Sequence, residues 1–136
     1  MSLSSAMFDR APRKVVPFRS VSQFKDYLQA EACSIVQVDV ARIGGITPWL
    51  KVAHLAEAYN VPVSPHFLME LHASLACGVT NGQWVEYIPQ LESITRVGLH
   101  VRDGFAHPSN EPGIGIDWDW DSIDNLSLNS VTIRKS

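Results

Sequence analysis

Three polar side chains stand at or near the ends of three predicted strands: Asp39, His66 and Glu86. An aspartate beside a histidine can hold the imidazole in one tautomer and raise its basicity, which makes a general base usable near neutral pH. A carboxyl group on the next strand could donate a hydrogen bond to a developing oxyanion. These residue types could therefore carry proton transfer, but polar residues at strand ends more commonly cap neighbouring loops and helix termini.

Other candidates carry weaker signals. Arg42 could contact an anionic substrate or satisfy a loop carbonyl, and both alternatives remain open. The alternating acidic run 117–121 begins like a calcium loop, but Ser122 and Leu128 stand where that loop needs glycine and glutamate. We therefore interpret the run as a solvated acidic face. We interpret His72 as a helix histidine whose hydrogen bonds are satisfied within the fold.

The elements that must hold these side chains alternate between helix and strand. Ser20 is predicted to cap a helix, and the β-branched run 34–40 predicts a strand that carries Asp39 at its end. After a Gly-Gly pair, the Thr-Pro pair at 47–48 predicts the start of a second helix. Its predicted buried face consists of Trp49, Val52, Ala53, Ala56 and Tyr59.

The same alternation continues along the chain. Residues 61–66 predict a second strand, 68–79 a helix and 84–88 a third strand. Short connections between alternating strands and helices favour parallel pairing with right-handed crossovers. Beyond these elements, residues 98–136 are rich in glycine and proline. We expect them, including the apolar stretch 131–133, to pack back on the body.

The composition is typical of a soluble globular domain. The chain has 136 residues, of which 46% are hydrophobic and 18% charged, with a net charge of −3. These values predict a single domain and exclude a disordered chain. No basic stripe, membrane-length apolar segment or secretory leader is visible, so we expect neither nucleic acid nor a membrane as partner, and a cytoplasmic location. Cys33 and Cys77 are interpreted as reduced core thiols.

Four motifs together resemble a known family. They are QVDVARIGGIT at 37–47, VPVSPH at 61–66, WVEY at 84–87 and PGIGI at 112–116. They look like the closing strands of the enolase superfamily, of the mandelate racemase / muconate lactonizing enzyme type, and within it the acid-sugar dehydratases. The resemblance runs from about residue 20 to residue 121. The spacings of 27 residues from Asp39 to His66 and 20 from His66 to Glu86 fit the same pattern.

The resemblance implies a chemistry for each residue. His66 would be general base or acid at a carbon next to a carboxylate, Asp39 would orient and polarise it, and Glu86 would hydrogen-bond the substrate carboxylate or the enolate. The family stabilises that enediolate with Mg²⁺. Loss of a β-hydroxyl would make the enzyme a lyase, an acid-sugar dehydratase. Racemisation would use the same intermediate with a second base on the opposite face.

The chain also departs from the family. A complete barrel of this type takes about 250 residues, and only its last strands are matched. The paired-lysine base motif and the acidic metal ligands of the earlier strands are absent. The third metal position falls on Val16, which cannot ligate Mg²⁺. The resemblance therefore implies Mg²⁺ while a single copy of this chain offers no ligands for it.

The predicted fold class is α/β, a partial TIM-type barrel made of the last βα units of an enolase-superfamily barrel, with a C-terminal extension. Residues 1–19 are expected to be a flexible tail or short edge strand, 20–97 the partial barrel and 98–136 the extension. The predicted function is the C-terminal part of a Mg²⁺-dependent acid-sugar dehydratase that is inactive alone. Its unpaired edges are expected to associate with a second copy or with the missing N-terminal portion. The alternative is a non-catalytic truncated remnant that self-associates as a structural or binding module.

Overall fold

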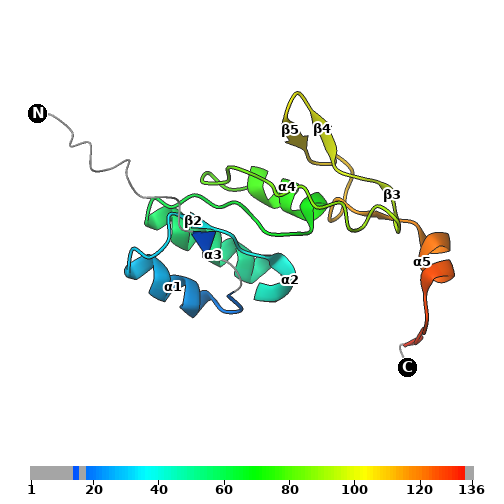
Figure 1. The fold of residues 1–136 in the computed structure, drawn as a ribbon, viewed down its shortest axis with the longest axis horizontal. Coiled ribbons are helices and arrows are strands. Elements are labelled where there is room, and N and C mark those ends of the chain that lie inside the picture. Colours follow the sequence, from blue (N-terminus) through cyan, green and yellow to red (C-terminus); the bar gives the residue numbers. More distant parts are fainter. Residues whose placement is uncertain (1–13, 16–17, 134–136) are drawn as a thin grey trace, which may run out of the picture.

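The computed structural model describes residues 14–15 and 18–133. The elements of this part of the chain follow in the order β1 (Lys14–Val15), α1 (Val21–Gln29), β2 (Ile35–Val36), α2 (Val40–Ile43), α3 (Ile46–Ala58), α4 (Met69–Cys77), β3 (Thr95–Val97), β4 (His100–Arg102), β5 (Phe105–His107), β6 (Asp117–Trp118) and α5 (Trp120–Leu126). Figure 1 shows an elongated arrangement with β2 and α1–α3 at one end, α4 in the middle, and the β4–β5 hairpin and α5 at the other.

Parallel backbone pairing joins four successive segments. β1 pairs in parallel with β2, and isolated parallel bridges join Val36 to Val63 and Val63 to Gly82. Three hydrogen bonds run between the β2 segment and residues 62–66, from Val36 N to the Pro62 carbonyl, from Ser64 N to the Val36 carbonyl and from His66 N to the Val38 carbonyl. The parallel order predicted from the alternation is therefore present for these segments.

The strands are much shorter than predicted. β2 covers only two residues of the predicted 34–40, because Val40 already begins α2. The prediction of a third strand at 84–88 is wrong: these residues form no strand, and the parallel bridge is made by Gly82 instead. The described residues form mixed helices and short strands, in which a barrel is not evident.

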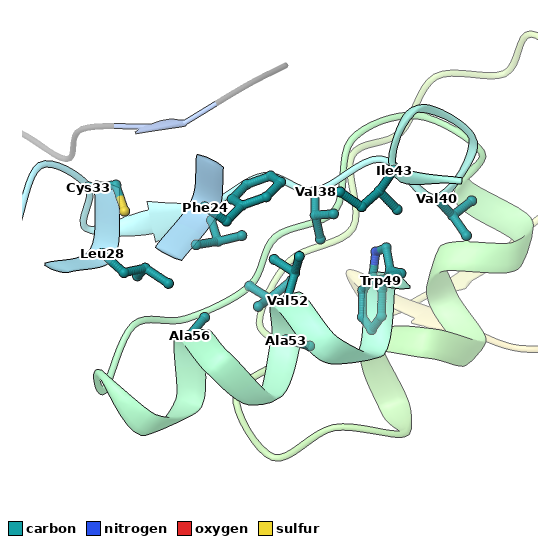
Figure 2. Close-up of a cluster of buried hydrophobic side chains, with 12 residues drawn as sticks. Phe24, Leu28, Cys33, Val38, Val40, Ile43, Trp49, Val52, Ala53 and Ala56 are labelled. Atoms are coloured by element: carbon teal, nitrogen blue, oxygen red, sulfur yellow. The ribbon is translucent and has the colours of Figure 1, made fainter. Parts of the chain in front are cut away.

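The core lies between α1, α3 and the β2 segment. Figure 2 shows side chains from these three elements pointing toward one another. α1 contributes Phe24 and Leu28, and the Ser20 hydroxyl accepts a hydrogen bond from Gln23 N, which confirms the predicted N-cap. Most of the predicted face of α3 is also buried, namely Trp49, Val52, Ala53 and Ala56. Tyr59 was placed on that face wrongly, because it is the C-cap of α3 and 39% exposed.

The Gly-Gly pair makes the sharp turn between α2 and α3. Gly44 has φ +95° and Gly45 has φ +116°, a backbone region that side chains with a Cβ rarely enter. Gly44 ends α2 and Gly45 is the N-cap of α3, so the chain reverses within two residues. As predicted, Pro48 lies in the first turn of α3, where its missing N–H costs no helix hydrogen bond.

The two cysteines differ in their burial. Cys33 is buried in the core, as predicted, and burial raises the pKa of its thiol. Cys77 was predicted to be a core thiol and is exposed, because it is the last residue of α4. Both are free, so the described chain has no disulfide between them.

The region beyond residue 94 is built from short antiparallel pairs. β3 pairs with β6 and β4 with β5, and Asp119 caps α5 by accepting a hydrogen bond from Ser122 N. The backbone at Gly115 lies against α4, where an added Cβ would be 3.1 Å from the Glu70 carbonyl oxygen. Val131 and Ile133 were expected to pack on the body, but these side chains are 87% and 92% exposed. The boundaries predicted for the tail (1–19), the partial barrel (20–97) and the C-terminal extension (98–136) stay a prediction.

No helix among the described residues is long and apolar enough to cross a membrane. The longest, α3, has 13 residues.

A glycine substitution after α1 is expected to stabilise the fold. Glu31 has φ +50°, a left-handed conformation that costs a non-glycine residue roughly 1–2 kcal/mol. Part of that gain is offset because glycine has more freedom in the unfolded chain, so Glu31→Gly should raise the free energy of unfolding by about 0.5–1 kcal/mol. Urea unfolding followed by circular dichroism measures this change in the free energy of unfolding. Lys25→Gly, inside α1, should instead lower stability by about 1 kcal/mol.

Candidate functional site

Asp39 is held in place by the helix that follows it. It is the N-cap of α2, and its Oδ1 accepts hydrogen bonds from Ala41 N at 2.8 Å and Arg42 N at 3.2 Å. This is ordinary capping, in which a short carboxylate satisfies backbone N–H groups of the first helical turn. The residue is 5% exposed. Capping through Oδ1 leaves Oδ2 directed at other partners.

The second oxygen of Asp39 meets His66. The His66 Nδ1 to Asp39 Oδ2 distance is 3.1 Å, and the backbone hydrogen bond from His66 N to Val38 sets the two residues side by side. An ionised carboxylate only accepts, so in the neutral ring Nδ1 carries the proton. The unprotonated Nε2 is then the basic atom, and the side chain is 24% exposed. The pair can therefore take a proton from a molecule that reaches Nε2.

Glu86 approaches from a loop rather than from a strand. Its Oε2 lies 4.0 Å from His66 Nε2 and accepts a 3.4 Å hydrogen bond from Phe67 N. Its side chain is 38% exposed. The structure thus brings all three predicted side chains together, with Glu86 on the same side of the imidazole as Nε2. A group that approaches both Nε2 and this carboxyl from the exposed side could exchange a proton with either.

Arg42 contacts the site from its own helix turn. Its Nε lies 3.4 Å from Asp39 Oδ2, and its side chain is 44% exposed. Neither a loop carbonyl nor a substrate is needed to explain its position, because the guanidinium partners the Asp39 carboxylate. Its predicted contact with an anionic substrate stays a prediction.

Two buried polar residues lie on α4 behind the trio. His72 is fully buried, and both ring nitrogens are hydrogen-bonded, Nε2 to Val40 N at 3.2 Å and Nδ1 to the Phe67 carbonyl. Its prediction as a satisfied helix histidine is confirmed. Glu70 is 4% exposed, and its Oε1 has no hydrogen-bond partner within the described residues. The sequence analysis missed the burial of Glu70, because α4 has no continuous polar face that would separate exposed from buried positions.

Protonation of His72 is expected to destabilise the fold. Burial disfavours the charged ring and lowers its pKa below the ordinary 6.5, the largest of several influences that include the nearby Asp39 and His66. Below pH 6.5 the unfolded chain therefore binds more protons than the folded protein, and the free energy of unfolding falls as the pH drops toward the folded-state value. Protonation of this one group changes the free energy of unfolding by at most about 1.4 kcal/mol per pH unit.

Urea unfolding in buffers between about pH 5 and 8 measures this dependence. The matched variant is His72→Gln, which has no titrating ring at this position and should show a shallower loss of stability below pH 6.5. Equal slopes for the two proteins would contradict the prediction.

Two clefts of the described chain lie away from the trio. A cleft of about 470 Å³ lies beside Glu70 and the segment 97–117, and another of about 1100 Å³ lies between α4 and the β4–β5 hairpin. Neither is lined by Asp39, His66 or Glu86. Substrate pockets usually bury most of their ligand. The His66 side chain is 24% exposed and belongs to neither of these two clefts.

Comparison with known proteins matches this arrangement to one family. Residues 18–122 match the family described as enolase C-terminal domain-like. The chain is 32% identical over 96 residues to L-talarate/galactarate dehydratase of Salmonella typhimurium strain LT2, covering 71% of this chain and 24% of the relative. It is 30% identical over 114 residues to D-galactonate dehydratase of Ralstonia nicotianae, covering 71% and 29%.

A solved structure of a similar dehydratase has the same fold as this chain over most of this chain's length. The structure of L-talarate dehydratase from Polaromonas sp. JS666, complexed with Mg and L-glucarate, has a TM-score of 0.80 and 32% identity. The match covers 88% of this chain and 34% of that one. This chain therefore spans about a quarter of the length of its curated relatives and a third of that solved structure.

The structure of that relative contains Mg, and no set of ligands for such an ion is found among the described residues of this chain. Mg²⁺ takes an octahedral set of oxygens, and both Asp39 oxygens already accept hydrogen bonds. Within the described part of the chain, no cluster of three or more His, Cys, Asp or Glu side chains could hold a metal ion. Val16, the predicted third metal position, lies outside the described residues. The donor set that is described does not fit Mg²⁺.

Proposed function

The chain belongs to the enolase superfamily, as an enolase C-terminal domain of the MR/MLE type, and on that premise we propose that it is the C-terminal part of an acid-sugar dehydratase. The observation that carries the proposal is the contact of His66 Nδ1 with Asp39 Oδ2, which leaves Nε2 free and 4.0 Å from Glu86. The finer picture, in which residues 20–97 are the closing units of a TIM-type barrel, is part of the same proposal. It is supported by the parallel bridges that join successive segments.

In this proposal the pair acts at a carbon next to a carboxylate. His66 Nε2 accepts the proton of that carbon, while Asp39 holds the ring and stabilises the imidazolium that forms. Glu86 hydrogen-bonds the substrate carboxylate or the enolate, and Arg42 supplies positive charge nearby. The β-hydroxyl then leaves as water, taking up the proton that His66 Nε2 carries. The enol tautomerises to a 2-keto-3-deoxy acid.

The rest of the enzyme lies outside this chain. The proposal includes a chain that is inactive alone, and it is supported by a match that covers only 24% and 29% of the two curated dehydratases. Further stabilisation of the enediolate would come from the missing N-terminal portion, and so would a second base if the reaction were racemisation. The substrate class proposed is an acid sugar, by likeness to the dehydratases named above.

Fragment complementation tests the proposal. We expect the isolated chain, given acid sugars and excess Mg²⁺, to form no 2-keto acid. Mixed or co-expressed with the N-terminal three quarters of the Salmonella dehydratase, it should restore 2-keto acid formation from L-talarate or galactarate. The N-terminal fragment alone is the control. A stable complex that forms no product from any acid sugar tested would contradict the proposal.

A second candidate function is a remnant that self-associates without catalysis. It is favoured by the apolar side chains that line the 1100 Å³ cleft while remaining exposed, namely Trp84, Tyr87, Val101 and Phe105. Exposed apolar patches of this kind mark protein contacts. Light scattering after gel filtration should then give a mass above 15.1 kDa, reduced to the monomer by Phe105→Glu. A homo-oligomer that fails complementation would favour the remnant.

A further inference from the structure

One buried ring connects the two chain segments that carry the Asp39–His66 pair. His72 Nε2 accepts a hydrogen bond from Val40 N at 3.2 Å, and Val40 is the residue after Asp39. His72 Nδ1 donates to the carbonyl of Phe67, the residue after His66. A single side chain on α4 therefore holds the backbone next to the base and the backbone next to its partner.

On the Asp39 side, His72 completes the helix cap. The first N–H groups of a helix have no partner within the helix. In α2, Asp39 Oδ1 takes the N–H groups of Ala41 and Arg42, and His72 takes that of Val40. With these donors satisfied, the Asp39 carboxylate is held with Oδ2 toward His66.

On the His66 side, His72 supports a backbone turn of unusual conformation. Phe67 has φ +63° and Leu68 has φ +38°, both in the left-handed region that side chains with a Cβ rarely adopt. This turn takes the chain from His66 directly into α4. The Phe67 carbonyl is bound by His72 and its N–H by Glu86 Oε2, so both polar groups of this peptide backbone are held.

We propose that His72 is a positioning residue, which keeps Asp39 and His66 in the relative orientation that protonates His66 at Nδ1 and frees Nε2. The proposal rests on the proposed function, since it concerns the same site. His72 is 0% exposed and touches no substrate, so it acts through its two backbone partners. Its ring must be neutral, because Nε2 has to accept from Val40. Burial, which lowers the pKa of His72, supports that state.

The chain offers variants that separate the two halves of this bridge. His72→Leu removes both hydrogen bonds. His72→Asn keeps a short amide donor for the Phe67 carbonyl, and His72→Gln reaches further and keeps an acceptor for Val40 N. His54→Leu is the matched control, because His54 is an exposed histidine on α3 that contacts none of these residues.

The experiment measures the tautomer of His66 in the full chain. The protein is labelled with ¹⁵N-histidine, and NMR gives the chemical shifts of the His66 ring nitrogens. Each variant is measured well below its melting temperature. We expect the wild type and His54→Leu to show the neutral His66 ring protonated at Nδ1. His72→Leu should lose that single form and give a mixture of the two tautomers. His72→Asn and His72→Gln, which each keep one half of the bridge, should show more of the Nδ1-protonated form than His72→Leu and clearly less than the wild type.

A purely structural role would lower the melting temperature and leave the His66 tautomer of the folded protein unchanged, which would overturn the inference while leaving the proposed function standing. If His72→Leu does not fold, a wild-type tautomer in both folded amide variants would overturn it equally. A wild-type protein without the Nδ1-protonated form would overturn both the inference and the observation on which the proposed function rests.

Discussion

Replacing His66 by asparagine is expected to lower the 2-keto acid formation of the complemented enzyme by roughly 10²- to 10⁴-fold, the usual contribution of a general acid–base group. The asparagine amide can occupy part of the imidazole's space and still donate a hydrogen bond to Asp39 Oδ2. It has no basic nitrogen to place where Nε2 lies, 4.0 Å from Glu86. The loss should therefore fall mainly on kcat, because proton transfer is removed while the surroundings are retained.

His54→Asn is the matched control for this experiment. His54 is exposed on α3, away from the trio, so its replacement should leave 2-keto acid formation within a factor of about two. Complex formation between the two fragments is measured in parallel by gel filtration, so that a loss of association is not mistaken for a loss of catalysis. Full activity of His66→Asn within an intact complex would exclude His66 as the acid–base group.

Replacing Trp49 by alanine is expected to destabilise the chain by about 3–5 kcal/mol, the range for removing a large buried aromatic side chain. Trp49 is 0% exposed and lies in the core below Val40 and Ile43 in Figure 2, and its ring centroid lies 6.1 Å from that of His72. Alanine would leave a cavity that α1, α3 and the β2 segment can fill only by moving. The free energy of unfolding from urea titrations at fixed protein concentration measures the loss.

Two variants bracket this prediction. Trp49→Phe should cost much less, because it keeps most of the apolar volume and removes an indole N–H that has no partner within the described residues. Trp120→Ala alters the same residue type at a site that is 62% exposed, and should change stability by less than about 0.5 kcal/mol. Similar losses for Trp49→Ala and Trp120→Ala would contradict the packing described for the core.

Local patterns were the most reliable guide to the fold. The Ser20 cap, the first turn of α3 with Pro48 and most of the buried face of that helix were predicted correctly. Each depends on residues within a few positions of one another, where capping and helical periodicity act directly. The strand at 84–88 was wrong, because an apolar run of strand length forms a strand only where a neighbour supplies its hydrogen bonds. In the described structure that neighbour pairs with Gly82.

The sequence by itself determined which residue types meet at the site and the family to which they point. Asp39 and His66 follow two segments that pair in parallel, so the topology places the two residues side by side. The structure then shows the 3.1 Å contact between them. The motifs between residues 37 and 116 indicated the family, and the family match over residues 18–122 shows it.

Only the tertiary structure decided how these residues are held. Glu86 reaches His66 from a loop 20 residues further along the chain, and His72 Nε2 reaches the backbone N–H of Val40, 32 residues away. Which of several histidines is exposed and which is buried also depends on where α4 packs. The physical reason is that these contacts join atoms distant in sequence, whose distances are set by the packing of whole elements and not by any local propensity.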